Sequence, residues 1–173
     1  QAAEAMGSID ILVNNAGITR DGLMMRMSDA DWLQVIEVNL NSAFRLCRGV
    51  LRGMMKARWG RIVNITSVVA QAGNPGQANY AAAKLGIVAL SKSIAVDMQR
   101  FNVRSNAVAP FAWTRMVSSI PTDTPEQQKR VEGLKKLIPE KIAPFVVALA
   151  SDAGAHVTGH IFGVRNNEIY LFS

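Results

Sequence analysis

Residues 67–84 read SVVAQAGNPGQANYAAAK, a stretch in which a hydroxyl, a phenol and an amine follow one another at fixed spacing. Tyr80 and Lys84 are four residues apart, so on a helix their side chains leave the same face. Ser67 ends the β-rich run GRIVNITS (Gly60–Ser67) and therefore lies at the carboxyl end of a predicted strand. Ligands of open parallel sheets bind at that edge. The stretch thus predicts a strand–loop–helix unit with three polar groups beside a ligand.

These three groups suit the interconversion of a carbonyl and an alcohol. A tyrosine is a poor acid–base catalyst at its usual pKa of about 10, and a cation one helical turn away favours the phenolate. We therefore expect Lys84 to lower the pKa of Tyr80, while Ser67 holds the substrate oxygen. The hydride would come from a nicotinamide cofactor. The alternative for Tyr-x-x-x-Lys alone is an ordinary helix with a surface Tyr and Lys, and only the companion motifs decide between the two.

Motifs on both sides of this stretch carry a resemblance to a known family. They are NNAG at Asn14–Gly17, VNL with Asn39, the Ser67–Tyr80–Lys84 spacing and RSNAVAP at Arg104–Pro110. With the long runs DILVNNAGITRD and GQANYAAAK, nearly the whole chain resembles the short-chain dehydrogenase/reductase family, in particular the 3-oxoacyl-acyl-carrier-protein reductases of fatty-acid synthesis. The resemblance implies an α/β doubly wound parallel sheet (Rossmann-like). It also implies reversible hydride transfer between NADP or NAD and a 3-oxo/3-hydroxyacyl thioester.

The same resemblance implies roles for individual residues. Tyr80 would be the acid–base, Ser67 would orient the substrate carbonyl, and Lys84 would also bind the nicotinamide ribose. Asn39 would hold a water that relays protons to the tyrosine. The residues expected to contact the cofactor are Asn14, Ala16, Gly17, Tyr80, Lys84, Pro110, Trp113 and Thr114. No metal site is expected, because no carboxylate or cysteine supports the pair His156 and His160.

The start of the chain departs from the family. Members carry a T-G-x-x-x-G-x-G turn that sets backbone N–H groups against the cofactor pyrophosphate, and that turn does not occur in this sequence. We therefore expect residues 1–173 to be a single partial domain, the catalytic half of a longer protein, without its N-terminal βα units. The alternative is a naturally shortened protein. Such a protein could be a non-catalytic chain that only assembles with partners.

Two later segments also depart from the reductases. FAWTRM replaces the usual P-G turn after Pro110, and the C-terminus GHIFGVRNNEIYLFS predicts two strands, Ile161–Val164 and Glu168–Phe172. Both features are more similar to the dehydrogenase domain of peroxisomal type-2 multifunctional enzymes, which oxidise (3R)-hydroxyacyl-CoA. The carrier therefore stays open between acyl carrier protein and coenzyme A, and a sugar, steroid or quinone substrate is a further alternative. Residues 117–137 occupy the place of the family's substrate lid.

The remaining elements follow from caps and periodicity. Ser28 is a predicted N-cap with Asp31 in the fourth position of a capping box. One expected helix runs from there to about Ala57, and the helix that carries Tyr80 and Lys84 ends at about Met98. Two more helices are expected, one between Glu126 and Leu137 and one over Pro139–Ser151, and the further strands are Ile9–Val13 and Val103–Ala109. Small residues on the Tyr80 helix permit close helix pairing, and the resemblance implies a homodimer or homotetramer.

Composition limits the compartment and the partners. Cys47 is the only cysteine, so no intrachain disulfide can form, and a cytoplasmic location is expected. No membrane span is expected, since the longest uncharged run, Ile62–Ala83, contains Asn, Gln, Gly and Pro. The net charge is +6, with basic residues clustered at Arg45, Arg48, Arg52, Lys56, Arg58 and Arg61. This cluster is either a solvated face or a docking surface for acidic acyl carrier protein or a coenzyme A phosphate. Nucleic acid is not indicated, because no aromatic residues interleave with the charges.

Overall fold

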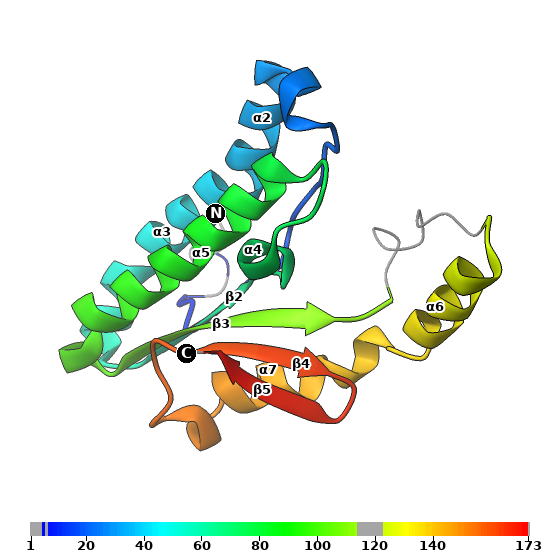
Figure 1. Cartoon of the computed structure of the whole chain (residues 1–173). Helices are drawn as coiled ribbons and strands as arrows, with labels where there is room; N and C mark the ends of the chain where they lie inside the picture. Colours follow the sequence, from blue (N-terminus) through cyan, green and yellow to red (C-terminus); the bar gives the residue numbers. More distant parts are fainter. Residues whose placement is uncertain (1–4, 6, 114–122, 173) are drawn as a thin grey trace.

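A computed structural model describes residues 5, 7–113 and 123–172 of the chain. Its centre is one five-stranded sheet in the order β1-β2-β3-β4-β5 (Figure 1). The strands are β1 (Ile11–Asn14), β2 (Gly60–Ile65), β3 (Val103–Phe111), β4 (Ile161–Arg165) and β5 (Glu168–Phe172). The first four run parallel and β5 is antiparallel to β4. Parallel neighbours require helical crossovers, which the intervening segments supply.

Helices cover both faces of this sheet, which confirms the doubly wound prediction. The α-helices are α2 (Asp29–Ile36), α3 (Ser42–Ala57), α4 (Val69–Ala72), α5 (Ala78–Asp97), α6 (Pro125–Lys135) and α7 (Ala143–Ala150). Short 3-10 turns are η1 (Met24–Arg26), η3 (Gln99–Phe101), η4 (Pro139–Lys141) and η5 (Asp152–Gly154). Helices α3 and α5 lie on one face of the sheet and α7 lies on the other (Figure 1). No described helix is both long enough and apolar enough to cross a membrane.

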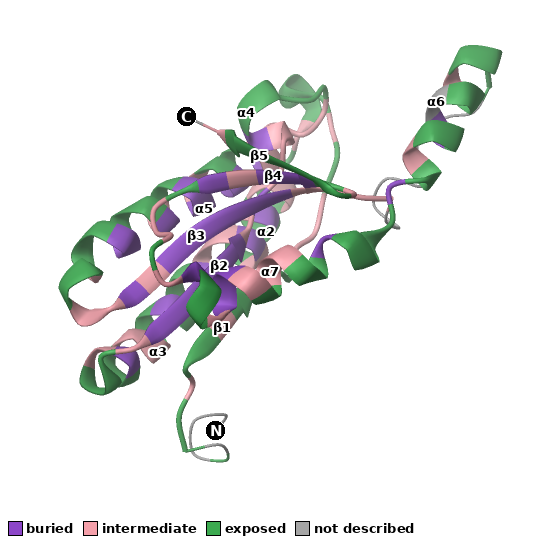
Figure 2. Cartoon of the chain, turned by 90° about the horizontal axis from the view of Figure 1, so that it is seen from below, coloured by how far each residue is buried: buried purple, intermediate pink, exposed green. Residues whose placement is uncertain are grey.

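The core consists of two apolar layers, one on each side of the sheet. Alternating side chains of β2 supply both layers, with Ile62 facing α3 and α5 and Val63 facing α7. Strands β2 and β3 are therefore buried along almost their full length (Figure 2). This two-sided burial explains why apolar residues such as Ile62 and Val63 follow one another without alternation, while the buried polar residues Asn64, Ser105 and Asn106 are hydrogen-bonded.

The helix that the sequence predicts from Ser28 to Ala57 contains an interruption. Its start is confirmed, because the Ser28 hydroxyl accepts a hydrogen bond from the Asp31 backbone N–H at 3.1 Å. Residues Glu37–Asn41 (η2) then form a π-helical turn between α2 and α3. Single π turns within helices occur frequently at functional sites. Here the turn contains Asn39, a polar side chain that is only 1% exposed.

Two other boundaries differ from the predictions for local reasons, and the C-terminal strands agree with them. Strand β2 ends at Ile65, and Ser67 lies beyond it, where the chain turns into α4. The helix expected over Pro139–Ser151 divides into η4 and α7, with Pro144 in the first turn of α7, where its missing N–H leaves no hydrogen bond unmade. The C-terminal strands are confirmed as a hairpin, whose turn has Asn166 at φ 50°, a left-handed conformation that Asn tolerates.

Candidate active site

A cavity of about 530 Å³ opens at the carboxyl ends of β1, β2 and β3. This is the sheet edge at which ligands bind in doubly wound folds. Its polar wall includes the side chains of Ser67, Gln77, Tyr80 and Lys84, together with Thr19. Apolar residues of α7 and of the turn before it form the opposite wall, among them Ile142, Ala143 and Val146. The cavity is thus a mostly apolar cleft with a few convergent polar groups, as small-molecule sites are.

Tyr80 and Lys84 lie one turn apart near the start of α5, as predicted. The Lys84 ammonium is 5.7 Å from the centre of the Tyr80 ring and donates a hydrogen bond to the Ile65 carbonyl at 2.8 Å. The Thr66 hydroxyl in turn donates to the Lys84 carbonyl at 2.7 Å. These two bonds connect α5 to the end of β2, so the strand and the helix present their side chains to the cavity in a fixed relation.

The pKa values at this pair differ from the prediction. Burial lowers the pKa of Lys84 to about 8, because the charged form loses hydration at a side chain only 3% exposed. Burial is also the largest influence on Tyr80 and raises its pKa, opposed by a hydrogen bond with Ser67 and assisted by the charge of Asp21. The predicted lowering of the Tyr80 pKa is therefore wrong for this structure. Enclosure in the cavity outweighs the effect of a lysine whose own charge is disfavoured.

Asn39 lies beside Lys84, and its side chain is bound to the backbone. Its Oδ1 accepts from the Ile18 N–H at 3.2 Å, and its Nδ2 donates to the carbonyls of Ile18 and Val35, both at 2.9 Å. The side chain thereby holds the segment that follows β1 against the π turn. Its expected role in holding a relay water stays a prediction.

Gly17 fits between Asn39 and Lys84 only because it has no side chain. A Cβ at this position would lie 2.5 Å from Asn39 Oδ1 and 3.4 Å from Lys84 Nζ.

Gly17→Ala should therefore displace the Asn39 side chain and the loop, and lower turnover by about 10- to 100-fold. The control is Gly49→Ala on α3, where a Cβ would meet nothing within 4 Å. Its gain in helix propensity should raise the free energy of unfolding by about 0.5–1 kcal/mol without changing turnover. Steady-state kinetics and thermal unfolding check both variants, and equal turnover in the two would contradict the close contact at Gly17.

The predicted cofactor-binding residues divide into two groups. Gly17, Tyr80, Lys84 and Pro110 line the cavity. Asn14 does not, because its amide donates to Cys47 Sγ at 3.3 Å and to Asn64 Oδ1 at 2.8 Å, on the α3 side of the sheet. Successive strand residues face opposite sides, so the neighbouring Asn15 faces the cavity instead.

The other predicted contacts lie outside the described cavity wall. Ala16 is absent from it. Trp113 packs toward α6: its backbone N–H donates to the Leu137 carbonyl at 2.6 Å, and Lys135 Nζ lies 5.9 Å from the centre of its ring. Thr114 and residues 117–122 of the predicted lid lie outside the described residues. The rest of that segment contains α6, which begins with a capping box at Thr124.

Sequence reasoning missed several residues of the wall. Asn15 could have been found from the period-two alternation of β1, and Gln77 from its place just before Tyr80. Ile142 and Val146 carried no such signal, since only the packing of α7 under the sheet brings them to the cavity.

The predicted basic cluster needs one correction. Arg45, Arg48, Arg52, Lys56 and Arg58 are exposed. Arg61 is 1% exposed in β2, where it donates to the carbonyls of Gly60 and Asn102 and lies 4.4 Å from the Trp59 ring. It therefore belongs to the interior and not to a docking surface. As for metals, the described part of the chain contains no group of three or more His, Cys, Asp or Glu that could hold an ion.

Comparisons with known proteins agree with this fold. A family profile described as enoyl-(acyl carrier protein) reductase matches residues 1–165. A crystal structure from Agrobacterium tumefaciens, named as a candidate gluconate dehydrogenase, superposes with a TM-score of 0.85 at 31% identity. The match covers 95% of this chain and 67% of that one. Fold and cavity thus define a Rossmann-like α/β protein.

Curated relatives are closer in sequence. The 3-oxoacyl-[acyl-carrier-protein] reductase FabG of Escherichia coli is 46% identical over 173 residues, covering 95% of this chain and 68% of the relative. The enzyme of the same name from Chlamydia trachomatis is 44% identical, covering 91% and 64%. Nodulation protein G of Rhizobium sp. is 46% identical, covering 95% and 69%. The chain belongs to the short-chain dehydrogenase/reductase family. It spans about two thirds of the length of these relatives.

Proposed function

We propose that the protein transfers a hydride reversibly between a nicotinamide cofactor, NADP or NAD, and a 3-oxo/3-hydroxyacyl thioester. The observation that carries the proposal is the convergence of Ser67, Tyr80 and Lys84 on one cavity at the ligand edge of the sheet. The relatives at 44–46% identity that are named 3-oxoacyl-[acyl-carrier-protein] reductases support the thioester as substrate.

In reduction, the carbonyl carbon gains a hydride and Tyr80 gives its phenolic proton to the oxygen; oxidation is the reverse. Ser67 is suited to hold that oxygen, because its hydroxyl accepts from the Val69 N–H at 3.2 Å and is hydrogen-bonded to Tyr80, so the two hydroxyl groups lie beside the same point of the cavity. A raised pKa keeps Tyr80 protonated at neutral pH, as a proton donor requires.

The residues present fit a nicotinamide cofactor. Within the described residues Lys84 donates one hydrogen bond, so two of its three N–H groups are free for ribose hydroxyls. Gly17 leaves room beside that lysine, and Asn15 and Pro110 extend the wall. A bound nicotinamide would supply or accept the hydride. We propose Gly17, Tyr80, Lys84 and Pro110 as direct contacts. Ala16, Trp113 and Thr114 are proposed as contacts from the family resemblance alone, and Asn14 would act indirectly, through its hydrogen bonds to Cys47 and Asn64 at the end of β1.

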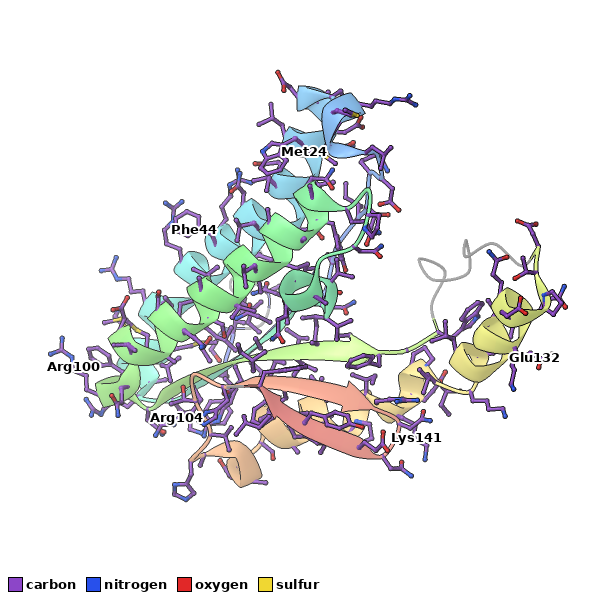
Figure 3. The ribbon with its side chains drawn as sticks, viewed as in Figure 1. Met24, Phe44, Arg100, Arg104, Glu132 and Lys141 are labelled. Atoms are coloured by element: carbon purple, nitrogen blue, oxygen red, sulfur yellow. The ribbon has the colours of Figure 1, made fainter. Side chains whose placement is uncertain are left out.

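The carrier and the assembly belong to the same proposal. The exposed basic residues of α3 support docking of an acidic acyl carrier protein or of a coenzyme A phosphate. Exposed apolar side chains on α3 and α5, such as Phe44 (Figure 3) and Leu85, support helix pairing in a homodimer or homotetramer. We further propose that residues 1–173 belong to a single Rossmann-like domain and form its catalytic half, with residues 117–137 covering the substrate. A free thiol at Cys47 is compatible with a cytoplasmic location.

The purified protein should be assayed with acetoacetyl-CoA and with acetoacetyl-acyl carrier protein, each with NADPH and with NADH. Loss of nicotinamide absorbance with either thioester supports the proposal, and the better carrier and cofactor follow from kcat/KM. Turnover only of a sugar, steroid or quinone ketone would replace the thioester by another substrate. No turnover with any of them would favour a non-catalytic role.

A further inference from the structure

We propose that Asn79 is the positioning residue of Tyr80, which fixes the start of α5 against the loop that forms the facing wall of the cavity. The inference rests on the proposed role of Tyr80. Asn79 does not line the cavity and is completely buried, at 0% exposed, so it acts through its neighbours and not on the substrate.

The Asn79 amide joins three parts of the chain. Its Oδ1 accepts a hydrogen bond from the Tyr80 backbone N–H at 2.7 Å. Its Nδ2 donates to the Arg20 carbonyl at 2.9 Å and, with a longer bond of 3.4 Å, to the Asp31 carbonyl in α2. A buried asparagine with both ends satisfied is both stabilising and geometrically specific.

The helix start explains why this bond is needed. The first N–H groups of a helix have no intrahelical acceptor and require a cap. The residue before α5, Gln77, makes no side-chain cap hydrogen bond. The Tyr80 N–H in the first turn is instead satisfied by Asn79, so the backbone of the proposed acid–base is held by its own neighbour.

Two further bonds connect the same pair of segments. The Gly22 N–H donates to the Gly76 carbonyl at 2.8 Å, and the Gln77 amide donates to the Asp21 carboxylate at 3.1 and 3.2 Å. The bonds between Gln77 and Asp21 are exposed, and Gly22 and Gly76 are half-buried, whereas the Asn79 side chain is completely buried. Water competes less with an enclosed bond, so Asn79 is the principal connection between residues 18–22 and α5.

The loop that Asn79 holds is also held from its other end. The Asn39 side chain is hydrogen-bonded to both the N–H and the carbonyl of Ile18. Gly17 and Thr19 of this loop line the cavity together with Tyr80. The distance between the phenol and this wall is therefore set by two buried asparagines, one on each side of the loop. A misplacement of about 1 Å can lower turnover by about 100-fold.

The test compares Asn79→Leu with a matched buried asparagine, Asn106. Asn106 is 1% exposed, donates to the Val157 carbonyl at 2.9 Å and accepts from the His160 N–H at 3.2 Å. Like Asn79, it therefore connects two distant segments through backbone hydrogen bonds, but it does not line the cavity. Both Leu variants should lower the melting temperature by similar amounts. Asn79→Leu should also lower kcat by about 10- to 100-fold with little change in KM, and Asn106→Leu should leave kcat unchanged. Equal kcat in the two variants would overturn the proposal.

A second readout does not need turnover. The sequence contains two tyrosines, Tyr80 and Tyr170, so in a Tyr170→Phe background the ¹³Cζ resonance of labelled tyrosine reports on Tyr80. Loosening the loop admits water, so Asn79→Leu should lower the titration midpoint of Tyr80 toward its ordinary value, and Asn106→Leu should not. An unchanged Tyr80 midpoint in Asn79→Leu would contradict the positioning role, even if the protein reduces no ketone. If the wild-type protein shows no turnover but Asn79→Leu lowers the Tyr80 midpoint as expected, only the proposed function is contradicted.

If Asn79→Leu does not fold, Asn79→Asp takes its place in both measurements. Aspartate keeps the acceptor for the Tyr80 N–H but loses the donor to the Arg20 carbonyl. A kcat below that of both wild type and the Asn106→Leu control supports the donor role. Wild-type kcat together with an unchanged midpoint contradicts it.

Discussion

Tyr80→Phe should lower kcat by about 10²–10⁴-fold while cofactor affinity stays nearly unchanged. The phenyl ring retains the packing of the tyrosine in the cavity wall but has no proton to give to the carbonyl oxygen. Ser67 cannot replace it, because a serine hydroxyl is too weak an acid at neutral pH. Steady-state kinetics with the thioester gives kcat, and nicotinamide fluorescence titration gives the dissociation constant of the cofactor.

The matched control is Tyr170→Phe, which removes the other tyrosine of the sequence, on the exposed face of β5. It should change neither quantity. Lost cofactor binding with preserved turnover in Tyr80→Phe would contradict the acid–base assignment, since the tyrosine would then act only as a contact for the cofactor.

Lys84→Met should stabilise the fold and impair the enzyme at once. The pKa of Lys84 in the folded protein, about 8, lies below its ordinary value of 10.5, so the unfolded chain binds more protons between these limits. The burial of the ammonium therefore opposes folding fully below pH 8, by about 3 kcal/mol at 1.36 kcal/mol per pKa unit. This destabilisation disappears as the pH rises toward 10.5.

Methionine removes that charge but also the hydrogen bond to the Ile65 carbonyl. The free energy of unfolding should consequently rise by only about 1–2 kcal/mol at pH 7, with the difference shrinking as pH approaches 10. Turnover should fall by about 100-fold or more, because ribose orientation and the local positive charge are both lost. Denaturant unfolding at several pH values and steady-state kinetics measure the two effects.

Lys92→Met is the control for this substitution. Lys92 is exposed on the same helix, and surface changes of this kind are usually within about 0.5 kcal/mol. If Lys84→Met destabilises the protein at pH 7, or if its stability difference grows with pH, burial of a charged lysine is not what lowers the pKa.

Much of this protein could be predicted from the order of its residues. The strand-forming runs at Gly60–Ser67 and Val103–Ala109, the cap at Ser28 and the four-residue spacing of Tyr80 and Lys84 are local features. Strand burial, helix capping and side-chain direction depend on a few neighbouring residues. For that reason the doubly wound sheet, the C-terminal hairpin and the convergence of Ser67, Tyr80 and Lys84 followed from the sequence alone.

Only the tertiary structure decided the direction of the Tyr80 pKa, the inward turn of Asn14, the burial of Arg61 and the connection made by Asn79. Each depends on what distant segments place around a side chain. Desolvation is set by the enclosing atoms and not by the adjacent residues in sequence, so spacing showed that a lysine stands near a tyrosine but not which effect on the phenol is larger. The sequence by itself determined which chemical groups meet at the edge of the sheet, and the packing around them determined their protonation and their hydrogen-bond partners.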